Sequence, residues 1–481
     1  MENNSIKKNA LLNIIYNILN IVFPLITFPY VSRVLQVERL GNVSFFTTVA
    51  NYAIMLASLG VNTYGIRAVS QVRDDKKKLS KTTAELLIIN TIASIVVIVL
   101  LIGSSFFISK FSAEPVLLAI NCALVFATPF GMNWLYSGLE QYGYITKRSI
   151  AVKGISLVLV FLFVKNSDDY CVYAAIIAFS TIGAYLLNLL YSQRFVSFKE
   201  LPSLQYKSHF KPMMVLFASS LAISVYINLD TIMLGFISGD EQVGLYTVAV
   251  KVKSLLLIAV NAISTVLLPR LSYYLAEKRW DDFRRVLKKS VSTILMISTP
   301  LVALFILEAK DSILFLGGQE YLGATVCMMI IMPILVISGF SNITGNQILI
   351  PMGKENCFMK AVIAGAFVDL ILNALLMPKW GCVGAAIATL IAECTQMSMQ
   401  TYYSREYIAP SIQWKTVLHI IASTIVAVIG TGIIRSMISI KDFVNLAISG
   451  ISFFVIYGLS LLIMKDGLAL VYLRDLTKRK L

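Results

Sequence analysis

The chain is predicted to be an all-α integral membrane protein, and three observations predict it. Hydrophobic residues make up 57% of the 481 residues and charged residues only 14%, whereas soluble domains carry about a quarter charged residues. The mean hydropathy is +0.78. Lys and Arg cluster in short stretches between every second pair of long apolar runs. This alternation is typical of a polytopic helical protein whose short basic loops face the cytoplasm.

Apolar windows bounded by charge, Pro or Gly predict about fourteen transmembrane helices of roughly 20 residues each. The windows are 10–33, 43–66, 82–108, 115–138, 150–165, 170–193, 211–237, 243–268, 290–307, 323–350, 358–377, 383–404, 415–434 and 444–464. The first run is too long for a signal peptide and no small-x-small cleavage site follows it, so we expect a retained helix kinked at Pro24 and Pro29.

The orientation follows from where the basic residues fall. With the N-terminus inside, 31 of the 41 Lys and Arg lie in inner segments, eight lie in outer segments, and Lys251 and Lys253 lie within a span. The excess predicts that both termini are cytoplasmic. The net charge of +15 then suits anionic membrane lipids and requires no nucleic-acid partner.

Several classes of protein are excluded. The six cysteines form no CxxC and the two histidines lie near inner span ends, so we expect no disulfide framework, metal site or cofactor. No GxxxxGK[ST] motif occurs, and no loop exceeds about 25 residues, which leaves no room for a catalytic or nucleotide-binding domain. The protein is therefore not expected to be an enzyme, and transport is the remaining class of function.

An internal repeat predicts the architecture. Gly41 precedes Arg67, and Gly244 precedes Arg270, by the same 26 residues. Two copies in the same orientation suggest two pseudo-symmetric six-helix bundles around a central cavity, although apolar helices also resemble one another by chance. The predicted domains are 1–205 and 206–410 for the bundles, and 411–481 for two further helices and a basic cytoplasmic tail.

Several motifs, in order along the whole chain, carry a family resemblance. They are Phe28-Pro29-Tyr30-Val31-Ser32-Arg33-Val34-Leu35, Leu40-Gly41, Leu59-Gly60, Tyr64-Gly65-Ile66-Arg67, Arg73-Asp74-Asp75-Lys76, Asn228-Leu229-Asp230-Thr231-Ile232-Met233-Leu234-Gly235, Val243-Gly244-Leu245-Tyr246, Asp369-Leu370-Ile371-Leu372-Asn373 and Gly384-Ala385-Ala386. The chain resembles the polysaccharide and O-antigen repeat-unit flippases of the multidrug/oligosaccharidyl-lipid/polysaccharide exporter superfamily. It departs from them at Gln36, where that family often has Gly, so we expect a slightly different helix geometry there.

The resemblance implies a flippase of the bacterial cytoplasmic (inner) membrane. Such a protein moves an undecaprenyl-pyrophosphate-linked oligosaccharide, for O-antigen, capsule or a similar polymer, from the inner to the outer leaflet by alternating access. An ion gradient (H⁺ or Na⁺) or the membrane potential would drive it. Its expected partners are the lipid-linked oligosaccharide, membrane lipids, and a polymerase with other glycan-assembly proteins.

Basic residues within the spans are the candidates for binding pyrophosphate. A desolvated pyrophosphate needs Arg or Lys facing a wet cavity. The candidates are Arg33, Lys251, Lys253, Lys153 and Lys360. Lys251 and Lys253 lie two positions apart, about 200° around a helix, so they do not both point into one cavity. For Arg33, Lys153 and Lys360, snorkelling to headgroups is the alternative interpretation.

Three acids within the spans are candidates for ion coupling or for lining the cavity. They are Asp230, Asp369 and Glu393. A carboxylate within the membrane is costly unless it is paired, hydrated or protonated. Structural hydrogen bonding, or an ion pair between Asp230 and Lys251 or Lys253, is the alternative.

Two other functions fit parts of the pattern. A drug/cation antiporter of the same superfamily would prefer an acidic cavity, and the basic residues in spans one and eight argue against it. A membrane-embedded oligosaccharide polymerase usually needs a larger outer loop than this chain offers.

Overall fold

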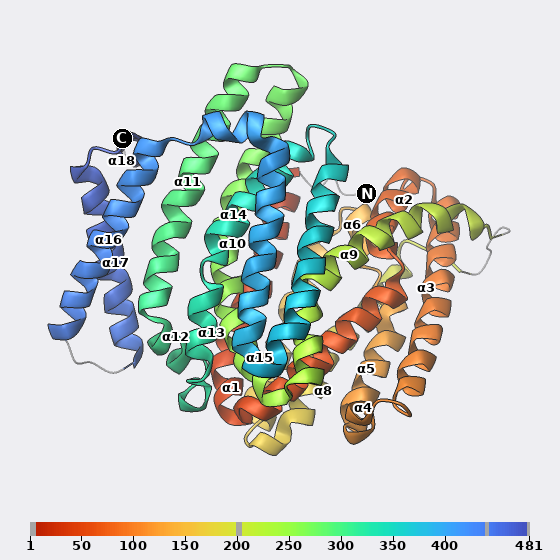
Figure 1. Cartoon of the computed structure of the whole chain (residues 1–481). Coiled ribbons are helices and arrows are strands. Elements are labelled where there is room, and N and C mark those ends of the chain that lie inside the picture. The colour runs from red at the N-terminus through yellow and green to blue at the C-terminus, as the bar shows by residue number, and fades with distance from the viewer. Residues whose placement is uncertain (1–5, 199–203, 438–441, 479–481) are drawn as a thin grey trace. The chain divides into compact units, whose positions relative to one another are not determined.

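The computed structural model describes residues 6–198, 204–437 and 442–478. Every regular element in those ranges is a helix, which confirms the predicted all-α class (Figure 1). The chain divides into two compact units, Met1–Gly235 and Phe236–Leu481. The predicted boundary at residue 205 precedes the helix α9 (Lys207–Ile237), whereas the division between the compact units falls near the end of that helix.

In the first unit, the long helix α1 packs against α3, α5, α7 and α8. Turns and short 3₁₀ segments join the other helices. The elements are α1 (Ile6–Ser58), α2 (Val61–Val72), α3 (Lys76–Ser104), α4 (Ser109–Ala113), α5 (Pro115–Ala127), η1 (Thr128–Gly131), α6 (Asn133–Gly138), α7 (Tyr142–Phe163), η2 (Ser167–Asp169), α8 (Tyr170–Ser192) and α9 (Lys207–Ile237).

The backbone of α1 leaves the helical region at Gln36, where φ is 64° and ψ is 176°. Only glycine adopts such dihedrals without strain, because a β-carbon clashes with the backbone there. This position is where the chain departs from the Gly of the family it resembles. The expected difference in helix geometry at Gln36 therefore takes the form of a sharp break between two helical segments.

Replacing Gln36 with glycine is expected to stabilise the protein. Relief of the strained conformation contributes about 1–3 kcal/mol, and the extra freedom of glycine in the unfolded chain offsets roughly 0.5–1 kcal/mol of that. The midpoint of thermal unfolding in detergent should rise for Gln36→Gly. Gln36→Ala is the control, because it retains the β-carbon and should not gain; an equal rise in both variants would contradict the explanation.

The segment expected to form one continuous span at 115–138 is interrupted. The helix α5 ends at Ala127, a 3₁₀ turn follows, and Met132 adopts a left-handed conformation (φ 40°) before α6 begins. Pro129 lies in the turn, and proline lacks the amide proton that would continue the helical hydrogen bonds. The break exposes backbone carbonyls that side chains must satisfy.

The second unit contains the remaining helices, and α16 and α17 lie side by side at its C-terminal end (Figure 1). The elements are α10 (Asp240–Ala276), α11 (Trp280–Leu307), α12 (Ala309–Leu316), η3 (Gln319–Tyr321), α13 (Ala324–Ile331), α14 (Ile334–Asn342), the π-helix η4 (Ile343–Leu349), α15 (Glu355–Ile408), η5 (Ala409–Ser411), α16 (Trp414–Met437), α17 (Asp442–Ile463) and α18 (Gly467–Lys478). The amphipathic helix α18 occupies part of the predicted basic tail.

The 54-residue helix α15 also has a sharp break, at Gly381 (φ 49°, ψ −127°). A β-carbon at Gly381 would overlap the side chain of Gln242, whose Oε1 accepts a hydrogen bond from the Cys382 amide at 3.0 Å. Glycine is required here both for the backbone conformation and for the close approach of α10.

Ten helical segments among the described residues are long and apolar enough to cross a membrane. Two of them, Leu25–Val72 and Glu355–Ser411, have 48 and 57 residues, and one crossing needs only about 20. The prediction of a multi-pass membrane protein is confirmed. The count of fourteen spans stays a prediction.

Candidate functional site

The two predicted cations of the first unit lie on different helices. Arg33 lies on α1, three residues before the break, and its exposed side chain donates from Nη1 to the Pro29 carbonyl oxygen at 2.8 Å. Lys153 lies on α7 and is half-buried, within electrostatic range of the Arg148 guanidinium. The role of either residue in binding pyrophosphate stays a prediction.

The three predicted cations of the second unit differ in how exposed their side chains are. Lys251 and Lys253 are both half-buried on α10, whereas Lys360 is exposed near the start of α15. Lys360 lies nine residues before Asp369, about 13 Å along the helix, so these two side chains occupy separate levels of the unit.

The predicted acid Asp230 belongs to the first unit. It is buried on α9 and interacts electrostatically with Tyr52 of α1. The Tyr52 hydroxyl donates to the Ser224 carbonyl oxygen of α9 at 3.0 Å. This bond holds α9 against the C-terminal part of α1, one to two helical turns from Asp230.

The other two predicted acids lie on the two arms of α15. Asp369 is almost fully buried, and its Oδ2 accepts a hydrogen bond from Nδ2 of the buried Asn373 at 3.1 Å. Glu393 is half-buried. Structural hydrogen bonding, the alternative to coupling, therefore accounts for part of the environment of Asp369.

The start of α10 and the break of α15 are joined by a set of hydrogen bonds. Ser238 Oγ donates to the Met377 carbonyl oxygen at 2.9 Å, and the hydroxyls of Tyr246 and Thr389 lie 3.0 Å apart. With the Gln242–Cys382 bond, these contacts hold the turn at Gly239 beside the turn at Gly381.

This arrangement aligns three of the predicted residues. Lys251 lies twelve residues after Gly239, and Asp369 and Glu393 lie twelve residues before and after Gly381. At 1.5 Å per residue, each is about 18 Å along its helix from the turn at Gly239 or Gly381. One cation and two acids therefore lie at the same level of the second unit. This alignment depends on the two turns being held side by side, so it could not be predicted from composition or from spacing within one helix.

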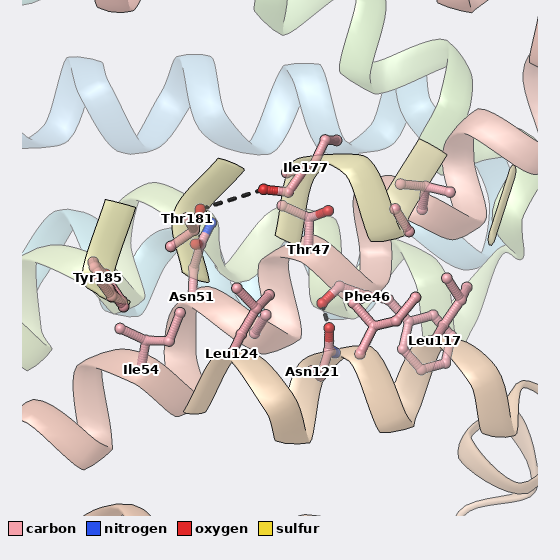
Figure 2. A pocket seen from close by; sticks show the side chains of 14 residues that line it. Phe46, Thr47, Asn51, Ile54, Leu117, Asn121, Leu124, Ile177, Thr181 and Tyr185 are labelled. Atoms are coloured by element: carbon pink, nitrogen blue, oxygen red, sulfur yellow. Dashed lines mark hydrogen bonds between the residues drawn. The ribbon is translucent and has the colours of Figure 1, made fainter. Parts of the chain in front are cut away.

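A cavity of about 220 Å³ lies within the first unit between α1, α5 and α8 (Figure 2). Polar side chains line part of it: Thr47, Asn51, Asn121, Thr181 and Tyr185. Asn121 Nδ2 donates to the Phe46 carbonyl oxygen at 2.9 Å, and Thr181 bonds back to Ile177 along α8. These side chains thus border a space large enough for several water molecules.

A buried arginine bridges the interruption between α5 and α6. In the sequence analysis it contributes only to the count of basic residues that predicts the orientation. Arg148 of α7 donates to Asn133 Oδ1 at 3.1 Å and to Asn188 Oδ1 of α8. Asn188 in turn donates to the Gly131 carbonyl oxygen, and the Tyr136 hydroxyl donates to the Asn188 carbonyl oxygen. The network satisfies the groups freed by the broken span.

Arg148→Ala is expected to destabilise the protein by about 3 kcal/mol or more, because it removes charged hydrogen bonds and leaves buried amide oxygens unsatisfied. The neighbouring Lys147 is exposed, so Lys147→Ala removes the same charge without burial and should change stability by less than about 0.5 kcal/mol. Thermal unfolding of both variants in detergent tests this, and similar midpoints would rule out the bridging role.

A second buried polar group joins α2, α3 and the start of α9 in the first unit. His209 Nε2 of α9 lies 2.8 Å from Glu85 Oε2 of α3, and a hydrogen bond of 2.8 Å joins His209 Nδ1 to the Tyr64 hydroxyl of α2. Glu85 Oε1 also accepts from the Gln205 amide at 2.5 Å. These bonds fasten the start of α9 to α2 and α3.

No metal centre emerges from these acids and histidines. Within residues 6–198, 204–437 and 442–478, no three His, Cys, Asp or Glu side chains gather as a metal ion would require. The chemistry that the described groups offer is the binding of anions by Arg and Lys and the exchange of protons or small cations at buried carboxylates.

The fold is similar to those of two solved membrane transporters. It matches the lipid II flippase MurJ in an inward closed conformation with a TM-score of 0.74 over 98% of this chain and 99% of that one, at 14% identity. An inward-facing multidrug resistance MATE transporter of the MOP superfamily matches with a TM-score of 0.63 over 82% of this chain and 94% of that one, at 15% identity.

The chain belongs to the polysaccharide biosynthesis protein family, whose model matches residues 6–275. A model of the MatE family matches residues 216–375. A putative O-antigen transporter of Escherichia coli (strain K12) is 24% identical over 403 residues, which are 83% of this chain and 97% of that protein. The family resemblance carried by the sequence motifs is confirmed.

Proposed function

We propose that the protein is a flippase that moves undecaprenyl-pyrophosphate-linked oligosaccharide repeat units, of O-antigen, capsule or a similar polymer, from the inner to the outer leaflet. The observation that carries this proposal is the similarity to a putative O-antigen transporter along 97% of that protein's length. The fold of a lipid II flippase, matched from end to end, supports it. Translocation makes and breaks no covalent bond, so the activity needs no catalytic residue.

In this proposal, about fourteen spans form two six-helix bundles and two C-terminal helices in the bacterial cytoplasmic membrane. Both termini face the cytoplasm. The excess of basic residues on one side supports this orientation, and the lengths of α1 and α15, each sufficient for two crossings, support the larger number of spans.

The pyrophosphate would be bound by basic side chains of the membrane-spanning helices. Arg33 and Lys251 are assigned the main contacts, and Lys253, Lys153 and Lys360 are assigned to the path along which the headgroup moves. The half-buried positions of Lys251, Lys253 and Lys153 support contact with a substrate that has lost much of its water.

Coupling to H⁺, Na⁺ or the membrane potential is assigned to Asp230, Asp369 and Glu393. The burial of Asp230 and Asp369 supports this assignment, because the charge state of a carboxylate within the membrane depends strongly on a bound cation or proton. The shared level of Lys251, Asp369 and Glu393 suggests that cation binding and pyrophosphate binding influence each other there. Glycosyltransferases would supply the substrate and a polymerase would consume it.

Leaflet-resolved detection of lipid-linked glycan tests the proposal. In cells that lack the protein, single-repeat lipid-linked glycan should accumulate on the inner leaflet, and restoring the protein should move it to the outer leaflet. Accumulation on the outer leaflet would identify a polymerase instead. Unchanged glycan in both leaflets would exclude both functions.

A drug/cation antiporter of the same superfamily is the second candidate, favoured by the MatE match over residues 216–375. Such a protein would confer efflux of cationic compounds on cells without affecting surface glycan. The basic residues Lys251 and Lys253 on α10 argue against it, because they would repel cationic substrates.

A further inference from the structure

A hollow of about 430 Å³ lies in the first unit where α2 ends, α3 begins and the chain turns after α8. Its lining comprises Arg73, Asp74, Lys76, Leu79, Arg194 and Phe195. Three cations and one carboxylate thus face a space in the size range of small-molecule sites. The charge distribution predicts that this side of the protein faces the cytoplasm, and none of these residues has a part in the proposed transport path.

The two segments that form the hollow are fixed to each other. The Ser197 amide, in the turn after α8, donates to Ser80 Oγ of α3 at 3.0 Å. Leu79 is buried in the core of the unit together with Val196, and Phe195 packs against the same cluster. The spacing of the basic groups is therefore set by the packed core rather than by mobile side chains alone.

The positive charges of the hollow are only partly neutralised. Arg73 Nη1 forms an ion pair with Glu140 Oε1 at 3.0 Å, whereas the Arg194 guanidinium lies over the Tyr191 ring at 5.0 Å from its centroid. Such a contact holds the guanidinium in place without cancelling its charge.

The nearby Asp75 carboxylate caps α3 and is paired with its own cation, the Lys78 ammonium 3.4 Å from Oδ2. Asp75 Oδ1 accepts from the amides of Lys77 and Lys78 at 3.0 and 3.1 Å. The hydrogen bond from the Lys78 backbone, followed by the weaker contributions of the Lys78 side chain and the Lys77 amide, lowers the pKa of Asp75 from its usual value. Lys76 and Arg194 form no ion pair within the part of the chain that the structure describes.

We propose that this hollow binds the phosphate of an anionic glycerophospholipid headgroup from the adjoining leaflet. Arg194 and Arg73 present the planar donors that bind phosphate oxygens in pairs, and Lys76 adds a third charge. Leu79 and Phe195 form an apolar floor that suits the glycerol and first acyl carbons of a lipid, which a free phosphate ion lacks. Basic pockets at the cytoplasmic ends of membrane helices are suited to anionic headgroups.

Native mass spectrometry of the purified full-length protein in detergent, titrated with phosphatidylglycerol or phosphatidylcholine, tests the site. The variant Lys76→Ala/Arg194→Ala leaves the Arg73–Glu140 ion pair intact and should weaken phosphatidylglycerol binding about thirtyfold, because two basic groups no longer reach the phosphate. The matched control is Arg284→Ala/Lys288→Ala, which removes two exposed charges from α11 and should change the affinity less than about threefold.

The charge-conserving variant Lys76→Arg/Arg194→Lys should retain most of the binding, which separates removal of the binding groups from a failure to fold. Three results would overturn the proposal. They are equal loss in both double-alanine variants, equal affinity for phosphatidylcholine, and displacement of the lipid by inorganic phosphate or pyrophosphate, which would identify a site for the free anion.

Discussion

Lys251→Ala is expected to reduce the export of lipid-linked glycan to below about a tenth of wild type while the protein still inserts into the membrane. The side chain is half-buried in α10, and a charged hydrogen bond to phosphate lost there is worth roughly 1.5–3 kcal/mol, or about 10- to 100-fold in the translocation step. Arg33→Ala is expected to have the same effect at the outer end of the path. Surface glycan, measured by lectin binding, and the amount of protein in the membrane fraction are the two readouts.

The controls separate charge at these positions from charge in general. Lys379→Ala removes an exposed cation two residues before the break of α15 at Gly381 and should leave export unchanged. Lys251→Arg keeps the charge and should retain part of the activity, reduced by the different shape of the guanidinium. Wild-type surface glycan in both Arg33→Ala and Lys251→Ala would refute the assignment of these residues to the substrate, but not the flippase function.

Glu85→Ala is expected to cost about 3 kcal/mol in stability, because it removes a buried carboxylate and leaves its buried hydrogen-bonding partners unsatisfied. The substitution leaves His209, the Lys81 ammonium 3.9 Å away and the Gln205 amide without their shared carboxylate. The start of α9 should then detach from α3 before the rest of the unit unfolds. Thermal unfolding and hydrogen exchange in the first turns of α9 measure the two effects.

Glu140→Ala is the matched control, because Glu140 is an exposed carboxylate paired with Arg73 in the same unit. Surface pairs contribute about 0–1 kcal/mol, so this variant should unfold near the wild-type midpoint. A double-mutant cycle with His209→Gln isolates the interaction itself. A coupling of zero between Glu85 and His209 would show that the carboxylate serves the backbone of residue 205 rather than the imidazole.

Much of the fold was readable from the sequence because the bilayer constrains it so strongly. Long apolar runs must be helical to satisfy their backbone groups, and most predicted windows overlap one helix, from α3 at 82–108 to α17 at 444–464. The windows 115–138 and 323–350 are each divided among several helical segments. The motifs near Arg33 and Asp369 carried the resemblance to the family. Gln36 could be marked as unusual, but a sequence cannot reveal that its φ is positive.

The buried networks could not be predicted in the same way. Glu85 and His209 are 124 residues apart, and Arg148 looks like any other basic residue near a span end until Asn133 and Asn188 are placed beside it. Side chains of different helices meet through packing, which periodicity within one helix does not encode. The hollow at Arg73 and Arg194 is hidden for the same reason, although the Arg73–Lys76 motif was visible.

The break at Gln36 also bears on how topology can be mapped. Helical backbone continues on both sides of this residue from Ile6 to Ser58, so the first two crossings are joined without an exposed loop for a protease to cut or a reporter enzyme to occupy. An epitope inserted after Gln36 would disrupt α1 itself. The exposed Lys165, between α7 and η2, is a position where a substituted cysteine can be labelled without interrupting a helix.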